Sequence, residues 1–146
     1  MTEEEIVRLV AAMPGTAAMT ASEDNGAPQV AWGDTFFFRE PERKLPFATL
    51  VVSDYPGFDE RSQLDRPGVF RLNVGVGRER FEELIGYPPS AHAERSGEFD
   101  YTELDRLLPH PAYAAQAWVS ILNPGERTEE LARALLAEAS RALRRP

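Results

Sequence analysis

The 146 residues suffice for one domain with its own core, and a content of 42% hydrophobic and 27% charged residues is typical of a globular protein. A formal net charge of −8 disfavours nucleic acid as a partner, because its phosphates require a basic surface. Zero cysteines exclude disulfides and thiolate metal sites, and an acidic N-terminus with no long apolar run predicts a cytoplasmic protein without membrane association.

A helix is predicted at the start of the chain. Thr2 and Glu5 have the spacing of a capping box, in which each side chain bonds the backbone N–H of the other residue. Apolar residues then recur at helical spacing, at Ile6, Leu9, Val10 and Met13. Pro14 and Gly15 end this helix.

Two hairpins are predicted next. Residues 16–21 have a weak strand pattern, and Asp24-Asn25-Gly26 predicts a tight turn, since Asn-Gly tolerates positive φ at both central positions. Residues 28–31 are the expected returning strand. The second hairpin pairs residues 36–39 with residues 47–52 across a polar turn at 40–44.

The middle of the fold is predicted at residues 69–86. Phe70, Leu72, Val74 and Val76 alternate with the other residues, which predicts a strand with one buried face. The pattern then changes to a helical period that Gly86 ends. Gly75-Val76-Gly77 faintly resembles a phosphate loop, but it lacks the lysine and the βαβ context of one.

The other segments have weaker patterns. We expect a turn of helix at 62–65, a mobile loop at 87–97 with His92 on its surface, and a short helix from Asp100 that Pro109 ends. A last strand is expected at 118–122 and a last helix at 128–143. This order predicts a single α+β domain over residues 1–146, a two-layer fold whose antiparallel sheet has flanking N- and C-terminal helices.

Short motifs add a resemblance to known families. Five segments resemble a bacterial family of unknown function that is common in actinobacteria: Gly33-Asp34-Thr35-Phe36-Phe37-Phe38, Pro46-Phe47-Ala48-Thr49, Asp54-Tyr55-Pro56-Gly57-Phe58-Asp59, Leu64-Asp65-Arg66-Pro67-Gly68-Val69-Phe70-Arg71-Leu72-Asn73 and Leu107-Leu108-Pro109-His110-Pro111. The element order also resembles MmcQ/YjbR-like domains. That second resemblance implies a double-wing (CyaY-like) fold that is sometimes linked to DNA binding, and neither family brings catalytic residues.

The candidate ligand-binding residues are His110, Trp118, Trp32, Asp34 and Tyr55. Pro109 and Pro111 hold His110 in a defined backbone, so its imidazole either faces a ligand or locks a turn. The tryptophans, with Phe36–Phe38, either line a pocket or an oligomer interface or belong to the core. Asp34, with Asp54, Asp59 and Asp65, either binds a cation or forms turns, and turns are favoured, so no metal site is predicted.

These residues favour a non-enzymatic domain that binds a small ligand or a protein, as a homodimer for instance, and needs no cofactor. Three alternatives stay open. Residues 18–49 faintly resemble the opening hairpins of pyridoxamine-phosphate-oxidase-like proteins, which implies a split barrel for a flavin or a nucleotide. The double-wing resemblance implies nucleic-acid binding. A hydrolase built around His110 is the third.

Overall fold

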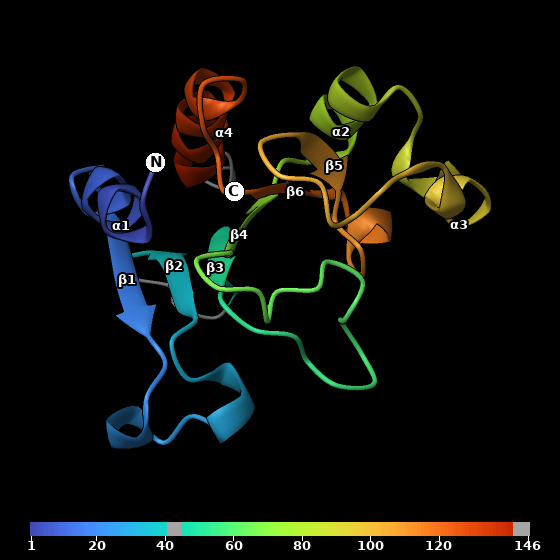
Figure 1. Ribbon diagram of the computed structural model, residues 1–146. Coiled ribbons are helices and arrows are strands. Elements are labelled where there is room, and N and C mark those ends of the chain that lie inside the picture. The colour runs from blue at the N-terminus through green and yellow to red at the C-terminus, as the bar shows by residue number, and fades with distance from the viewer. Residues whose placement is uncertain (41–44, 142–146) are drawn as a thin grey trace.

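The computed structural model describes residues 1–40 and 45–141, and its core is a six-stranded antiparallel sheet with the order β1-β2-β3-β4-β6-β5 (Figure 1). The strands are β1 (Thr16–Thr20), β2 (Thr35–Arg39), β3 (Ala48–Val51), β4 (Arg71–Gly75), β5 (Leu107–Pro109) and β6 (Trp118–Leu122). The α-helices are α1 (Glu3–Ala11), α2 (Arg78–Ile85), α3 (His92–Arg95) and α4 (Glu129–Arg141).

One face of the sheet packs against helices from both ends of the chain. Ile6 and Val10 of α1, with Leu135 and Leu136 of α4, share a buried core with strand residues such as Leu72. Phe81 of α2 joins the same core, so α1, α2 and α4 lie on one side of the sheet (Figure 1). The predicted α+β class is confirmed: the central strand expected at Phe70–Val76 is present inside the sheet as β4 (Arg71–Gly75), and helices from both ends of the chain share its core.

The local signals at both helix ends work as predicted. Thr2 and Glu5 form the capping box of α1, with reciprocal hydrogen bonds of 3.1 and 3.0 Å. Gly86 ends α2 in the left-handed region at φ 100°. Helix α4 is described to Arg141, so the predicted end at residue 143 lies outside the described residues.

The first predicted hairpin is only partly right. Strand β1 pairs with β2, but residues 28–31 are not the returning strand, because Gln29–Ala31 forms a 3₁₀ turn. The Asn25 side chain accepts from Ser22 N at 3.0 Å and donates to Thr20 O at 2.8 Å. These bonds fold residues 23–25 into a 3₁₀ turn, so the chain returns only at Thr35. The second hairpin is confirmed as β2–β3, although residues 41–44 of its turn lie outside the described residues.

Three further predictions are wrong. Residues 100–109 form no helix: Asp105 has φ 54°, which ends any helix there, and Leu107–Pro109 pairs with β6 as an edge strand. Residues 62–65 form turns and not a helix, because the Arg66 guanidinium donates hydrogen bonds to the backbone carbonyls of Ser62 and Gln63. The predicted mobile loop at 87–97 is instead a series of short helical turns, α3 among them.

Strand β4 differs from prediction in one way that matters for function. We expected one buried face, but Arg71 and Asn73 on the opposite face are 0% and 1% exposed. A second, smaller hydrophobic cluster explains this burial, since Val51, Leu64, Leu108 and Leu122 pack on that side. Leu64 belongs to the long β3–β4 connection, which therefore covers the polar face of the sheet.

Trp118 packs closely on Gly75, its partner in the β4–β6 register. An added Cβ at Gly75 would lie 2.9 Å from Trp118 Cε2, so we expect Gly75→Ala to lower the free energy of unfolding by about 1–3 kcal/mol. Urea denaturation measures this. The matched control is Gly97→Ala, which meets nothing within 4 Å and should be neutral or stabilise by up to about 1 kcal/mol. Equal effects of the two substitutions would contradict this packing.

Candidate functional site

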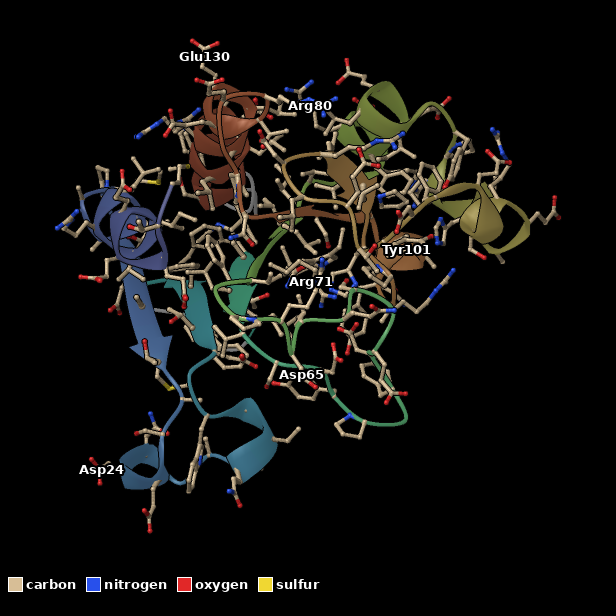
Figure 2. The ribbon with its side chains drawn as sticks, viewed as in Figure 1. Asp24, Asp65, Arg71, Arg80, Tyr101 and Glu130 are labelled. Atoms are coloured by element: carbon tan, nitrogen blue, oxygen red, sulfur yellow. The ribbon has the colours of Figure 1, made fainter. Side chains whose placement is uncertain are left out.

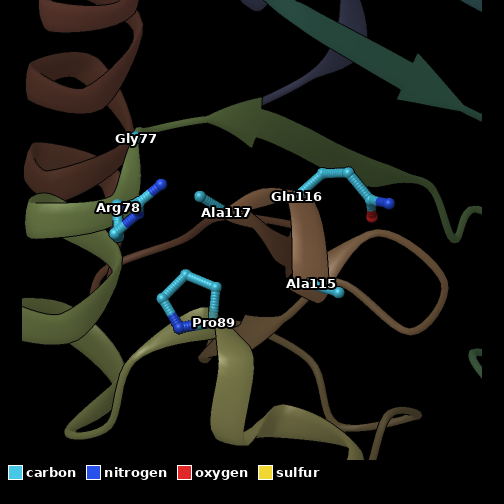
Figure 3. A pocket seen from close by; sticks show the side chains of 6 residues that line it. All are labelled: Gly77, Arg78, Pro89, Ala115, Gln116 and Ala117. Atoms are coloured by element: carbon cyan, nitrogen blue, oxygen red, sulfur yellow. The ribbon is translucent and has the colours of Figure 1, made fainter.

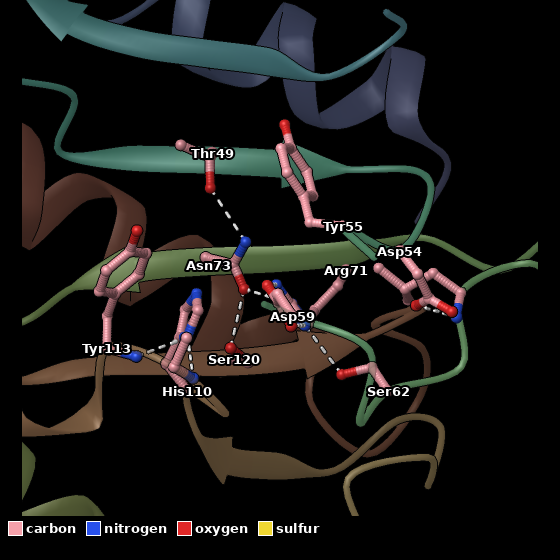
Figure 4. Close-up of polar contacts among 12 residues, drawn as sticks. Thr49, Asp54, Tyr55, Asp59, Ser62, Arg71, Asn73, His110, Tyr113 and Ser120 are labelled. Atoms are coloured by element: carbon pink, nitrogen blue, oxygen red, sulfur yellow. Dashed lines mark hydrogen bonds and ion pairs between the residues drawn. The ribbon is translucent and has the colours of Figure 1, made fainter. Parts of the chain in front are cut away.

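Asn73 lies at the centre of a hydrogen-bond network on the covered face of the sheet (Figure 4). In the register, Asn73 lies between Thr49 of β3 and Ser120 of β6. Its Nδ2 donates to Thr49 Oγ1 at 2.9 Å, and its Oδ1 accepts from Ser120 Oγ at 2.8 Å. The same Oδ1 accepts from Arg71 Nε at 2.8 Å. Strand pairing therefore brings Thr49, Asn73 and Ser120 together, and Arg71 joins them from two residues earlier on β4.

Arg71 occupies the middle of the molecule (Figure 2) and is fully paired with the β3–β4 connection. Its two terminal nitrogens reach the Asp59 carboxylate at 3.0 and 2.5 Å, and Nη1 also donates to Ser62 Oγ at 2.8 Å. Burial alone would raise the pKa of Asp59, but the hydrogen bonds and charge of Arg71 hold that pKa below its usual range. The pair is thus a buried arginine–carboxylate bridge that fixes the connection on the sheet.

A second buried carboxylate, Asp34, lies beside this bridge. Tyr55 Oη donates to Asp34 Oδ2, and the Val52 backbone N–H donates to Asp34 Oδ1 at 2.9 Å. Burial raises the pKa of Asp34, while those two hydrogen bonds and the charge of Arg71 oppose the rise. Burial and the nearby Asp34 also raise the pKa of the Tyr55 hydroxyl, so this phenol keeps its proton at neutral pH.

His110 is buried directly after β5 and is held by the backbone of the next turn. Its Nδ1 accepts hydrogen bonds from the N–H groups of Ala112 and Tyr113, both at 2.9 Å. Burial lowers the pKa of His110 to about 3, and the charge of Arg71 acts in the same direction, against that of Asp59. Because Nδ1 accepts two bonds, the single ring proton lies on Nε2, and His110 is a neutral hydrogen-bond donor.

An exposed aromatic ring, Tyr113, borders His110, and a second exposed ring, Phe58, packs on Tyr113. The ring of Tyr113 lies 4.9 Å from the His110 ring and 5.8 Å from that of Phe58, measured between centroids. Tyr113 is 44% exposed and Phe58 is 60% exposed. His110 itself is only 3% exposed, and its Nε2 has no hydrogen-bond partner among the described residues. We call His110, Tyr113 and Phe58 the His110 surface.

Four of the five predicted site residues form two pairs whose members contact each other. Trp118 meets His110 edge to face at 6.4 Å, and Asp34 binds Tyr55. The fifth, Trp32, lies in the β1–β2 connection and donates its indole N–H to Ala27 O at 2.9 Å. None of the described contacts joins Trp32 to the other four.

Asp54 and the three phenylalanines have structural contacts. Within the described ranges, no group of three or more histidines and acidic residues is placed to hold a metal ion. Asp54 instead accepts from Leu64 N at 2.9 Å, as a turn former does. The three phenylalanines are divided between the two faces of β2. Phe37 is buried in the core, and Phe36 and Phe38 are half-buried on the opposite face.

The sequence predicted His92 as an ordinary surface residue, and this prediction is wrong. It is 8% exposed, and its Nδ1 lies 2.8 Å from the Tyr87 hydroxyl. Its Nε2 is enclosed and has no partner among the described residues. Burial lowers the pKa of His92, and the charge of Arg61 adds to this effect. His92 therefore anchors the segment around α3 as a neutral ring.

Two small cavities lie between the start of α2 and residues 115–117 (Figure 3). The first, of about 260 Å³, is lined by Gly77, Arg78, Pro89, Ala115, Gln116 and Ala117. The second, of about 250 Å³, shares Arg78, Pro89 and Ala115 with it. The faint phosphate-loop pattern at 75–77 thus borders a cavity in which Arg78 is the single charged residue among those that line it.

These features define a small α+β domain with a buried polar face and one open aromatic surface. The chain belongs to a family of unknown function, DUF6194, whose model matches residues 1–145. No curated protein and no solved structure matches this chain, so its resemblance to MmcQ/YjbR-like domains stays a prediction. None of the helices in the described ranges has the length and apolar character needed to cross a membrane.

Proposed function

We propose that this protein is a non-enzymatic cytoplasmic binding module whose His110 surface takes a small, uncharged, planar ligand. The observation that carries the proposal is the state of His110. Two backbone N–H groups fix its ring, and its Nε2–H is a donor without a partner in the described chain, in a side chain that is buried beside the exposed Tyr113 ring. A ligand with a carbonyl or ring-nitrogen acceptor fits that donor.

The neighbouring rings favour a flat ligand. Tyr113 and Phe58 expose aromatic faces beside the donor, and aromatic pairs gain about 0.5–1.5 kcal/mol beyond the burial of their area. Arg71, whose charge acts on His110, is paired with the Asp59 carboxylate, and Asp34 adds a second carboxylate. Arg71 is therefore not free to bind the phosphate or carboxylate of a charged ligand.

The same electrostatics support binding over catalysis. A general base works best with a pKa near the operating pH, whereas burial lowers the pKa of His110 to about 3. The hydroxyls of Ser62 and Ser120 bond Arg71 and Asn73 and not an imidazole, so neither is activated as a nucleophile. This favours the binding module over the hydrolase alternative.

The flavin or nucleotide split barrel has less support. The sheet is open, with β1 and β5 at its two edges, whereas a barrel closes those edges. The cavities of about 260 and 250 Å³ are smaller than the roughly 300–1,000 Å³ typical of pockets that bury an organic ligand. The net charge of −8 continues to disfavour nucleic acid.

The proposal is tested by two-dimensional ¹H–¹⁵N NMR with three probes: benzamide, benzoate and cyclohexanecarboxamide. We expect benzamide to shift the amide signals of residues 108–118 and 55–59. Benzoate lacks neutrality and cyclohexanecarboxamide lacks the flat ring, so both should shift these signals several-fold less. Tyr113→Leu should abolish the benzamide shifts, and Trp32→Leu, at an exposed tryptophan elsewhere, should keep them. An absence of localised shifts, or shifts that survive Tyr113→Leu, would overturn the proposal.

A further inference from the structure

The outer edge of β1 carries backbone groups that the described chain leaves open. Ala21 N–H donates to Asp34 O, and Gly15 O accepts from Glu40 N–H. In an antiparallel pair, alternate residues bond the same neighbour, so the odd-numbered residues of β1 face β2. Thr16, Ala18 and Thr20 therefore direct their N–H and C=O groups outward, and Asn25 takes the Thr20 carbonyl.

Apart from its Thr20 end, where Asn25 occupies the carbonyl, this edge lacks the protection that the other edge has. Strand β5 is short and contains Pro109, which has no N–H to offer, and both features block pairing with another strand. Strand β1 has the sequence Thr-Ala-Ala-Met-Thr, without proline or charge, and its register with β2 runs without a bulge. Ala18, Met19 and Thr20 are all exposed. Such an edge can accept a further strand.

The sequence of β1 is nearly the same when read in reverse, so it suits a second copy of itself. In an antiparallel pairing centred on Ala18, Thr16 faces Thr20 of the second copy and Ala17 faces its Met19. Ala18 then lies on the two-fold axis opposite itself, and its open N–H and C=O form a reciprocal pair. The pairing brings no two charges together along the strand.

Charge and apolar surface favour the same partner. Two copies that each carry a net charge of −8 repel one another, so contact is favoured at an uncharged strip such as β1. Met19 is 40% exposed, and the register places it beside Phe36, which is half-buried on β2. A second β1 at this edge would extend the partly covered apolar face that Met19 and Phe36 form.

We propose that the protein forms a two-fold homodimer in which the β1 strands pair antiparallel about Ala18 and join the two sheets into one. This inference is independent of the His110 surface, which lies at the β5–β6 end of the sheet.

The test uses charge reversal on the axis, read by native mass spectrometry and size-exclusion chromatography with light scattering on the full chain. We expect a dimer for the wild type. Ala18→Glu and Ala18→Lys each place like charges opposite one another and should be monomeric. A mixture of the two variants should restore the dimer as the mixed pair. The matched controls are Ala115→Glu and Ala115→Lys, at an exposed alanine far along the chain, which should leave the dimer intact.

Three outcomes would overturn the proposal: a monomeric wild type, a dimer that survives Ala18→Glu, or a mixture that stays monomeric. A cysteine at the axis gives a second measurement if either charged variant fails to fold. The chain has no cysteine, so Ala18→Cys can cross-link only to a second copy. Residues opposed across a pairing lie about 5.5 Å apart at Cα, within disulfide range. Oxidation should give a covalent dimer of Ala18→Cys but not of Ala115→Cys, and failure to do so contradicts this register.

Discussion

Arg71→Met is expected to lower the free energy of unfolding by about 3–5 kcal/mol, because it leaves Asp59 as a buried charge without its partner. Ser62 and Asn73 lose a donor at the same time. A domain of this size has a total stability of about 5–15 kcal/mol, so a large share of it is lost. Urea denaturation at pH 7 measures the change.

The control for Arg71 is a second arginine–carboxylate pair in the same chain. Arg80 binds Glu138 at 3.0 Å, but these side chains are 33% and 43% exposed. Arg80→Met should therefore change the free energy of unfolding by no more than about 1 kcal/mol. The double variant Arg71→Met/Asp59→Leu removes both buried charges and should recover much of the loss. A loss below about 1 kcal/mol for Arg71→Met would show that the bridge is not buried as described.

His110 should make the protein sensitive to mild acid. Burial lowers its pKa in the folded state from 6.5 to about 3. Between these two values His110 binds a proton in the unfolded chain but not in the folded chain. The stabilisation by neutral His110 is complete above pH 6.5 and is lost progressively as the pH falls towards the folded pKa. The expected slope is about 1.4 kcal/mol of stability per pH unit.

His110→Asn isolates this contribution. Asparagine places an acceptor oxygen where Nδ1 accepts from Ala112 and Tyr113, but it does not titrate. Urea denaturation at pH 7, 6, 5 and 4.5 should show a flatter dependence for the variant than for the wild type. The lowered pKa of His92 leaves a residual slope of the same sign. Parallel slopes for the two proteins would contradict the burial of a neutral His110.

The sequence predicts the fold best where one local signal decides the structure. Three such signals each predict an element that the structure contains: the capping box at Thr2, the glycine stop at Gly86 and the alternation of residues 69–76. Predictions fail where a side chain from elsewhere takes over the backbone. Asn25 folds the first turn onto itself, and Asp105 binds the backbone of Gly125 and Thr128, which holds residues 104–107 out of a helix.

The site follows the same division. His110 and Asp34 stand out in sequence because prolines and glycine flank them. Arg71 and Asn73 are missed, because a polar residue on alternate strand positions normally predicts a solvated face. Only the β3–β4 connection, which carries Asp59 from twelve residues earlier in the chain, turns that face into a buried network. Polar residues at matched register positions in three adjacent strands, as at Thr49, Asn73 and Ser120, are the signal that could have found it.

Imidazole ¹⁵N NMR of His110 between pH 7.5 and 4.5 tests the central claim most directly. We expect a neutral ring protonated at Nε2, with Nδ1 as an acceptor, and ¹⁵N shifts that stay constant over this range. A ring that titrates near its ordinary value of 6.5, or one that carries its proton on Nδ1, would contradict the fixed donor on which the proposed function depends.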